Sequence, residues 1–144
     1  MLPSLNLSTY CYYEMFHGCS NMITSPKLPS LTLAEYCYYG MFRYCESLIV
    51  VPDLPSPTIP TYAYAYMFYG CTSITKTPKI NATIDQYYTS GSYYQSSYCC
   101  YYMFYNCTNL VDASSMTIHD TTIGSYVFAY CFANCSSLVY LPNI

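Results

Sequence analysis

One short pattern recurs along the chain and constrains its fold more than any other feature. Each copy has an aromatic residue, a cysteine three residues later, and an apolar residue three positions beyond that cysteine. The aromatic residues that mark the copies are Phe16, Phe42, Phe68, Phe104 and Phe132, spaced by 26, 26, 36 and 28 residues. A single copy of this size cannot bury its own apolar face. The period therefore predicts units that stack on one another.

The repeat divides the chain into five units that form a single domain over residues 1–144. The units are 2–27, 28–53, 54–79, 80–115 and 116–144. The fourth unit is longer because it carries an insertion before its Met-Phe pair. A chain of 144 residues is long enough for one domain with a modest core.

Each unit predicts a helix followed by a short strand. In the second unit, Thr32 and Glu35 have the spacing of a capping box. Apolar residues then follow at helical spacing, and they are Leu33, Cys37, Tyr38, Met41, Phe42 and Cys45. The residue before the repeat cysteine is Gly or Asn in four of the five units, which predicts a left-handed helix stop, whereas the second unit has Tyr44 there.

The strand is predicted from β-branched residues such as those at 49–51, and it should end near the proline that follows. Stacked units would pair these strands in parallel. Because helices are wider than strands, the stack should curve with strands inside and helices outside. The predicted fold class is an α/β solenoid.

The cysteines predict two columns in the stack. One contains Cys19, Cys45, Cys71, Cys107 and Cys135, and the other contains Cys11, Cys37 and Cys99. Ala63 and Val127 replace cysteine in the second column, which favours buried free thiols acting as small apolar groups, with disulfides between units as the alternative. The repeats have no Cys-x-x-Cys, and the two histidines lie at unrelated repeat positions, so no metal or cofactor is expected.

Tyrosines occupy recurring positions. Tyr10, Tyr36, Tyr62, Tyr98 and Tyr126 share one position in all five units, which predicts a stacked aromatic ladder. Another set is predicted to face solvent and to offer a contact surface, namely Tyr13, Tyr39, Tyr66, Tyr101, Tyr102 and Tyr130.

Two further regions are candidate ligand-facing surfaces. The insertion in the fourth unit, 86–97, is uncharged and rich in Tyr and Ser, which suits adaptable contacts through Tyr87, Tyr88, Tyr93 and Tyr94. A tolerated loop without a binding role is the alternative. The predicted strand face presents variable residues that include Lys76, Asp112 and Tyr140.

The two ends of the repeat array should expose apolar side chains and unpaired strand edges. The residues expected there are Leu2, Leu5, Leu138, Tyr140 and Leu141. Because the sequence ends in the repeat phase in which it begins, a second copy could continue the stack head to tail into a filament. The alternative is a longer array from which this chain is one part.

The repeat resembles the BspA-like leucine-rich repeats of bacterial surface proteins. The resemblance rests on Met41-Phe42-x-x-Cys45-x-x-Leu48 and its copies, and on the Pro-x-Leu-Pro segments at 26–29 and 52–55. It implies a leucine-rich-repeat horseshoe or arc of five coils, used as a non-catalytic interaction scaffold at the cell surface or outside the cell.

Composition restricts the function further. Only 8% of residues are charged and the net charge is −3, which argues against a nucleic acid partner. The apolar runs are too short to insert in a membrane. The scattered His, Asp and Glu residues give no basis for catalysis. We therefore expect an extracellular structural subunit that forms a head-to-tail homopolymer. The alternative is an adhesin-type module that binds a surface protein or glycan through its strand face and the 86–97 insertion.

Overall fold

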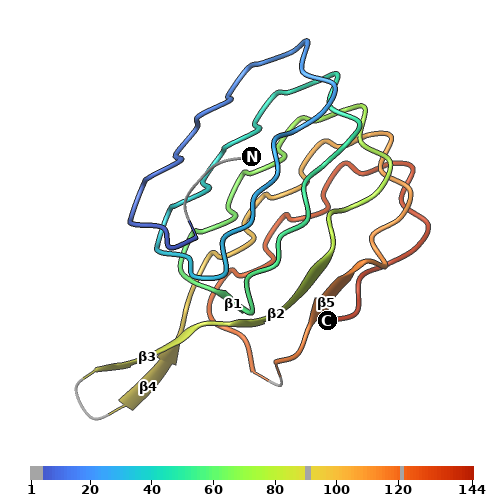
Figure 1. Ribbon diagram of the computed structural model, residues 1–144. Helices are drawn as coiled ribbons and strands as arrows, with labels where there is room; N and C mark the ends of the chain where they lie inside the picture. The colour runs from blue at the N-terminus through green and yellow to red at the C-terminus, as the bar shows by residue number, and fades with distance from the viewer. Residues whose placement is uncertain (1–4, 90–91, 121) are drawn as a thin grey trace.

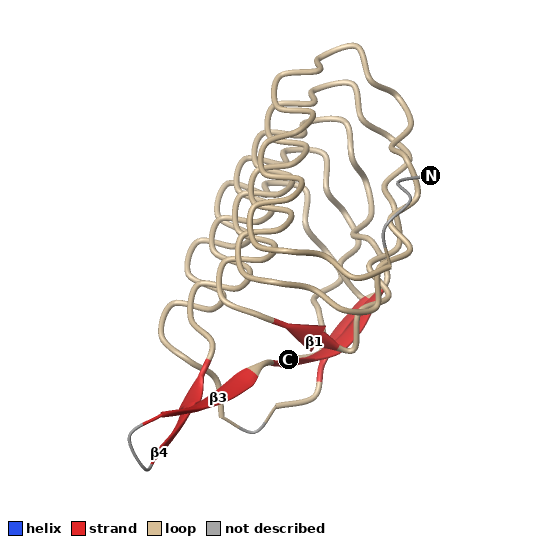
Figure 2. Cartoon of the chain, turned by 60° about the vertical axis from the view of Figure 1, so that its left-hand side comes forward, coloured by secondary structure: helices blue, strands red, loops and turns tan. Residues whose placement is uncertain are grey.

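The computed structural model describes residues 5–89, 92–120 and 122–144, and these ranges contain strands and turns but no helix. The strands are β1 (Thr58–Ile59), β2 (Ile80–Ile84), β3 (Gln86–Thr89), β4 (Ser92–Gln95) and β5 (Met116–Ile118). Five repeat units lie side by side in chain order, as the colour gradient in Figure 1 and the turned view in Figure 2 show.

The predicted fold class is wrong, because the segments expected to be helices are runs of consecutive turns. We call these runs the turn segments, and they cover 9–18, 35–44, 61–70, 99–106 and 125–134. The chain is therefore not an α/β solenoid with helices outside. The leucine-rich-repeat horseshoe that the resemblance implied is not its fold.

Two sets of backbone hydrogen bonds build a turn segment. Every second N–H donates to the carbonyl three residues earlier, as Met41 does to Tyr38. The N–H groups between them donate to the next unit, as Phe42 does to Met67 at 2.9 Å. Five such bonds, with N···O distances of 2.8–3.4 Å, join each of the four pairs of neighbouring units. The backbone polar groups of each unit are thus satisfied by its neighbours, as burial requires.

The backbone of a turn segment repeats every four residues. Positive φ angles recur at this spacing, for example 57° at Tyr36, 58° at Gly40 and 59° at Tyr44. The predicted left-handed conformation before the repeat cysteine is confirmed, and Tyr44 adopts it too, but it ends no helix. Side chains alternate in pairs between core and surface, so that Cys37, Tyr38, Met41 and Phe42 are buried while Tyr36 and Tyr39 face outward.

The opposite side of each unit is where parallel pairing occurs. Strands β1, β2 and β5 form a parallel sheet in the order β1-β2-β5, with Ile80 opposite Met116. Where the sequence predicted a strand at 49–51, the structure has only an isolated parallel bridge between Thr24 and Val50. Leu54 and Ile80, which open their units, also pair in parallel.

Candidate interaction surfaces

A column of tyrosine rings runs across the outer face of the turn segments. The column contains Tyr10, Tyr36, Tyr62, Tyr98 and Tyr126, as predicted. Successive ring centroids are 4.8, 4.7, 4.8 and 5.0 Å apart, and neighbouring planes differ by at most 19°. We call this set the tyrosine column.

All five residues of the tyrosine column have left-handed backbone, with φ between 56° and 60°. This conformation costs an L-residue about 1–2 kcal/mol. A stacked aromatic pair contributes about 0.5–1.5 kcal/mol beyond its buried area. Because four stacked pairs stand against five strained residues, stacking within the column offsets only part of the backbone strain. Elsewhere the chain relieves such strain with glycine, as at Gly18 and Gly70.

Arg43 contacts residues of three units and lies among further tyrosines that are exposed or half-buried. Its guanidinium lies 5.2, 5.3 and 5.0 Å from the ring centres of Tyr44, Tyr66 and Tyr69. One terminal nitrogen lies 3.8 Å from a carboxylate oxygen of Glu14 in the first unit. Because aromatic faces and a carboxylate already surround this cation, we assign it a role in holding the units together.

The cysteine column is buried in the middle of the stack. All ten cysteines are free, so the disulfides considered from the sequence are absent. The thiols of Cys45, Cys71 and Cys107 each donate to a phenylalanine carbonyl of the preceding unit, at 3.0–3.1 Å. Burial raises the pKa of the Cys45 thiol to about 11 and that of Cys71 further. These thiols serve packing, because their thiolates are disfavoured.

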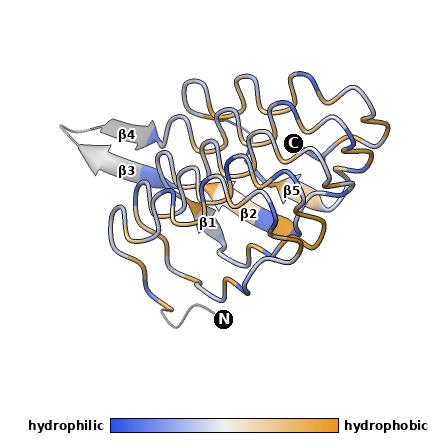
Figure 3. Cartoon of the chain, turned by 90° about the horizontal axis from the view of Figure 1, so that it is seen from above, coloured by the Kyte–Doolittle hydropathy of each residue, from blue (hydrophilic) through white to orange (hydrophobic). Residues whose placement is uncertain are grey.

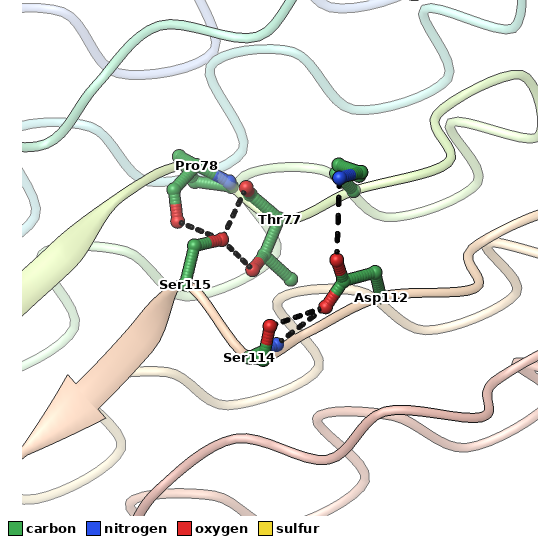
Figure 4. A network of polar contacts seen from close by, with 6 residues as sticks. Thr77, Pro78, Asp112, Ser114 and Ser115 are labelled. Carbon is green, nitrogen blue, oxygen red and sulfur yellow. Dashed lines mark hydrogen bonds and ion pairs between the residues drawn. The ribbon is translucent and has the colours of Figure 1, made fainter.

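On the strand face, the predicted ligand-facing pair is engaged within the chain. Asp112 accepts hydrogen bonds from the N–H and hydroxyl of Ser114, at 2.9 and 2.6 Å, and lies 3.4 Å from the Lys76 ammonium (Figure 4). These hydrogen bonds and Lys76 lower the pKa of Asp112. The Asp112 carboxylate already has hydrogen-bond and charge partners within the chain, so we assign the pair a structural role in linking units three and four.

The insertion in the fourth unit forms an antiparallel hairpin of β3 and β4 that extends away from the stack (Figure 1). Its strands lack the orange of hydrophobic residues in Figure 3. Tyr87, Tyr88, Tyr93 and Tyr94 are paired along its two strands in the register Tyr87–Tyr94 and Tyr88–Tyr93. The side chains of these four candidate residues lie outside the described part of the structure.

A groove of about 470 Å³ lies between two proline-rich segments at unit boundaries, 24–29 at the first boundary and 50–55 at the second. It is open and mostly apolar, with Lys27 and Asp53 among its lining residues. Sequence reasoning did not single out this groove.

The two outermost units present unpaired backbone groups at complementary positions. In the last unit, the alternate N–H groups that would bond to a following unit have no partner among the described residues. These donors are Tyr126, Phe128, Tyr130, Phe132 and Asn134. In the first unit, the carbonyls that would accept from a preceding unit are likewise without a partner in the described ranges. They are Thr9, Cys11, Tyr13, Met15 and His17.

Some side chains are exposed in the first or last unit although their equivalents in interior units are buried. Met15 is 51% exposed, whereas its equivalents Met41, Met67 and Met103 are fully buried. Leu141 is 70% exposed, whereas the equivalent Ala113 is fully buried. Cys19 is exposed at the first unit, although the rest of its column is buried or half-buried. We call the two surfaces that carry these groups the first and last end faces.

The predicted end residues divide into three groups. Leu2 lies outside the described residues. Leu5 and Tyr140 are exposed, but so are their equivalents Leu31 and Val50 in the second unit, so their exposure is not a property of the ends. Leu138 is half-buried against the core, and Leu141 is exposed at the last end face. Met15 and the backbone groups were missed, because the helix prediction assigned their hydrogen bonds within the unit.

The comparisons with known proteins find no match for this chain. No family model matches it, nor does any curated protein or solved structure. Among the described residues, no three His, Cys, Asp or Glu side chains come together as metal ligands. No helix long and apolar enough to cross a membrane occurs in the described part of the chain.

Proposed function

We propose that this chain is a structural subunit that associates with further copies of itself, the last end face of one copy seated on the first end face of the next. The observation that carries the proposal is the complementarity of the two faces. Five N–H donors at one end occupy the repeat positions that bond, in every interior pair of units, to the five carbonyls left open at the other.

The register of such a contact follows from the interior of the stack. Tyr98 donates to Ser125, which precedes Tyr126, the counterpart of Tyr10. By the same rule Tyr126 would donate to Thr9 of the next copy, and Phe132 would donate to Met15. Such a contact uses two different surfaces and need not close on itself, and repetition without closure gives a filament.

Burial adds to these hydrogen bonds. Covering Met15 and Leu141 removes large apolar side chains from water, which contributes about 1.5–3 kcal/mol for each fully buried side chain. Each backbone hydrogen bond adds about 0.5–1.5 kcal/mol. The chain offers little long-range charge repulsion against association, since its net charge is only −3. Location outside the cell and the lack of catalysis remain predictions from the sequence.

Two single substitutions test the contact, one on each face. Met15→Lys on the first face and Leu141→Lys on the last face should each leave the subunit folded, because both side chains are exposed in it. Wild-type chain should form filaments as its concentration rises, and each variant should stay small by sedimentation velocity and electron microscopy. Ile49→Lys is the matched control, because Ile49 is 58% exposed within an interior unit and should not affect assembly.

Mixing the two variants makes the test sharper. Met15→Lys keeps a working last face, and Leu141→Lys keeps a working first face. Their mixture should therefore stop at a one-to-one dimer. A wild type that stays monomeric at high concentration, or variants that still form filaments, would overturn the proposal. Association of either variant with itself would point to a different surface.

A second candidate function, adhesion, is favoured by the projecting hairpin of β3 and β4. The base of the hairpin is closed by the Ser96 N–H, which donates to the Asp85 carbonyl at 2.8 Å. Replacing 87–94 by a two-residue turn should therefore leave the stack intact. If the hairpin is a binding arm, this variant should form filaments normally but lose adhesion to glycan-coated or protein-coated surfaces.

A further inference from the structure

The tyrosine column has a chemical property that packing does not require. Its five phenols are held in register at centroid distances of 4.7–5.0 Å, and all of them are exposed or half-buried on the outer face. A parallel column of Phe16, Phe42, Phe68, Phe104 and Phe132 stacks at 5.4–5.6 Å around the core. The core contains this phenylalanine column and also the buried tyrosines Tyr38 and Tyr64, whereas every ring of the accessible column is a phenol.

The tyrosines of the column also occupy positions that disfavour them. All five have left-handed backbone, which glycine or asparagine adopts more readily. The third left-handed position of the unit uses those residues at Gly18, Gly70, Asn106 and Asn134. Tyrosine also has left-handed backbone outside the column, at Tyr44, Tyr66, Tyr102 and Tyr130, but only the column position has it in all five units, which points to a role for the phenol itself.

We propose that the tyrosine column is a site of oxidative coupling, at which a one-electron oxidant such as a peroxidase acting with hydrogen peroxide joins neighbouring tyrosines as dityrosine. Each phenol loses one electron and one proton to become a phenoxyl radical. Two adjacent radicals form a carbon–carbon bond between the ring positions next to the oxygens. The hydrogens on those carbons move to the oxygens and restore both aromatic rings. Overall, two hydrogen atoms are removed and the peroxide is reduced to water.

The fold supplies what this reaction needs. Radical coupling competes with diffusion and quenching, so neighbouring rings that are already adjacent react first. The column provides four such pairs within one chain, and each pair bridges two units. The half-buried and exposed rings keep enough freedom to turn edge to edge, which the fully buried Tyr64 does not. Coupling would fasten each unit covalently to the next.

The pattern of linked peptides tests the inference. Trypsin cuts after Lys27, Arg43, Lys76 and Lys79, which separates Tyr10, Tyr36, Tyr62 and Tyr98 into different peptides. Dilute chain treated with peroxidase and hydrogen peroxide should give dityrosine links between tyrosines of neighbouring units. Fragmentation must distinguish the column pairs from Tyr13–Tyr39, which stacks at 4.8 Å outside the column and joins the same two peptides as Tyr10–Tyr36. The expected pairs are Tyr10–Tyr36, Tyr36–Tyr62 and Tyr62–Tyr98, assigned by fragmentation in the mass spectrometer.

Tyr36→Phe keeps a ring in the column but removes its phenol. It should abolish the links from Tyr36 to Tyr10 and to Tyr62, while the Tyr62–Tyr98 link remains. Tyr140→Phe, at an exposed tyrosine outside the column, is the matched control and should leave all three links in place. Links scattered among tyrosines regardless of register, or links dominated by Tyr140, would overturn the inference.

The same experiment, repeated at concentrations at which filaments are expected to form, separates this inference from the filament proposal. A link between peptides 1–27 and 80–144 through Tyr10 and Tyr126 requires two copies stacked head to tail, because these residues stand at opposite ends of the column. Links within one chain without that pair would support the column and count against the filament. Assembly of the wild type without any links in the column would support the filament and count against the coupling of the column.

Discussion

At the scale of single residues, the buried thiols make the fold sensitive to alkali. Burial raises the pKa of Cys37 and of Cys99 to about 12 from the ordinary value of 9.0. Below pH 9 these thiols are protonated in both states and leave stability unchanged. Above pH 9 the unfolded chain loses protons that the folded chain keeps, so stability falls as pH rises toward 12.

We therefore expect the free energy of unfolding to decrease above pH 9 by about 1.4 kcal/mol per pH unit for each such thiol. Urea unfolding followed by circular dichroism at a series of alkaline pH values measures this slope. Cys37→Ala, which places at this position the residue that the third unit has at Ala63, should fold and should reduce the slope by one thiol. An unchanged slope would mean that this thiol ionises freely in the folded chain.

At the scale of the element, the turn segment depends on residues that tolerate left-handed backbone. Gly18 and Gly70 both have φ of 72° and hold the same position in their units. A β-carbon at Gly18 would meet nothing within 4 Å, whereas one at Gly70 would lie 2.7 Å from the Tyr44 ring of the preceding unit. A substitution at Gly18 therefore measures backbone strain alone, whereas one at Gly70 measures backbone strain together with a contact between units.

Gly18→Ala should destabilise the chain by about 1 kcal/mol through backbone strain alone. Gly70→Ala should lose that amount and about 1–3 kcal/mol more, because the Tyr44 ring must move. Thermal or urea unfolding of both variants gives the difference directly. Equal losses would show that the ring moves aside freely and that packing between units does not restrain it.

The sequence predicted the register of the repeats but not the backbone of the turn segment. Cys37, Met41 and Cys45 are spaced by four residues, which satisfies a helical pattern over a short stretch. In a helix, however, each step of four residues rotates the side chain by about 40°, so strict spacing of four drifts off one face. The strict spacing of four residues, repeated in five units, therefore indicated a backbone with a period of four residues rather than a helix. Propensity could not reveal it, because tyrosine at positive φ is rare.

The sequence likewise predicted one of the candidate surfaces, the tyrosine column, but not the backbone groups of the end faces. The tyrosine column depends only on register, so Tyr10 and its equivalents were placed correctly. The end faces depend on which backbone groups point along the stack, and the helix prediction had already used those groups within each unit. The exposure of Leu5 does not mark an end by itself, because Leu31 at the same position of the second unit is exposed as well.

At the scale of the whole molecule, stability comes from contacts between neighbouring units, so the first and last units differ from the rest. Cys11 and Cys19 are exposed in the first unit, while Cys37 and Cys45 at the same positions in the second are buried. Brief alkylation of dilute, folded chain should therefore label Cys11 and Cys19 and spare the buried thiols. At concentrations where filaments form, Cys19 should become protected in the wild type but remain reactive in Met15→Lys. Labelling that does not depend on concentration would contradict the proposed contact.

The hydrogen bonds between the turn segments all run in one direction, with the N–H on the earlier unit and the carbonyl on the later one. Their peptide dipoles consequently add along the stack, as they do along an α-helix. The last end face carries partial positive charge from its open N–H groups, and the first carries partial negative charge from its open carbonyls. A fibre built from such subunits would be electrically polar, with two distinguishable tips that could grow at unequal rates. An applied field would turn all such fibres to point the same way.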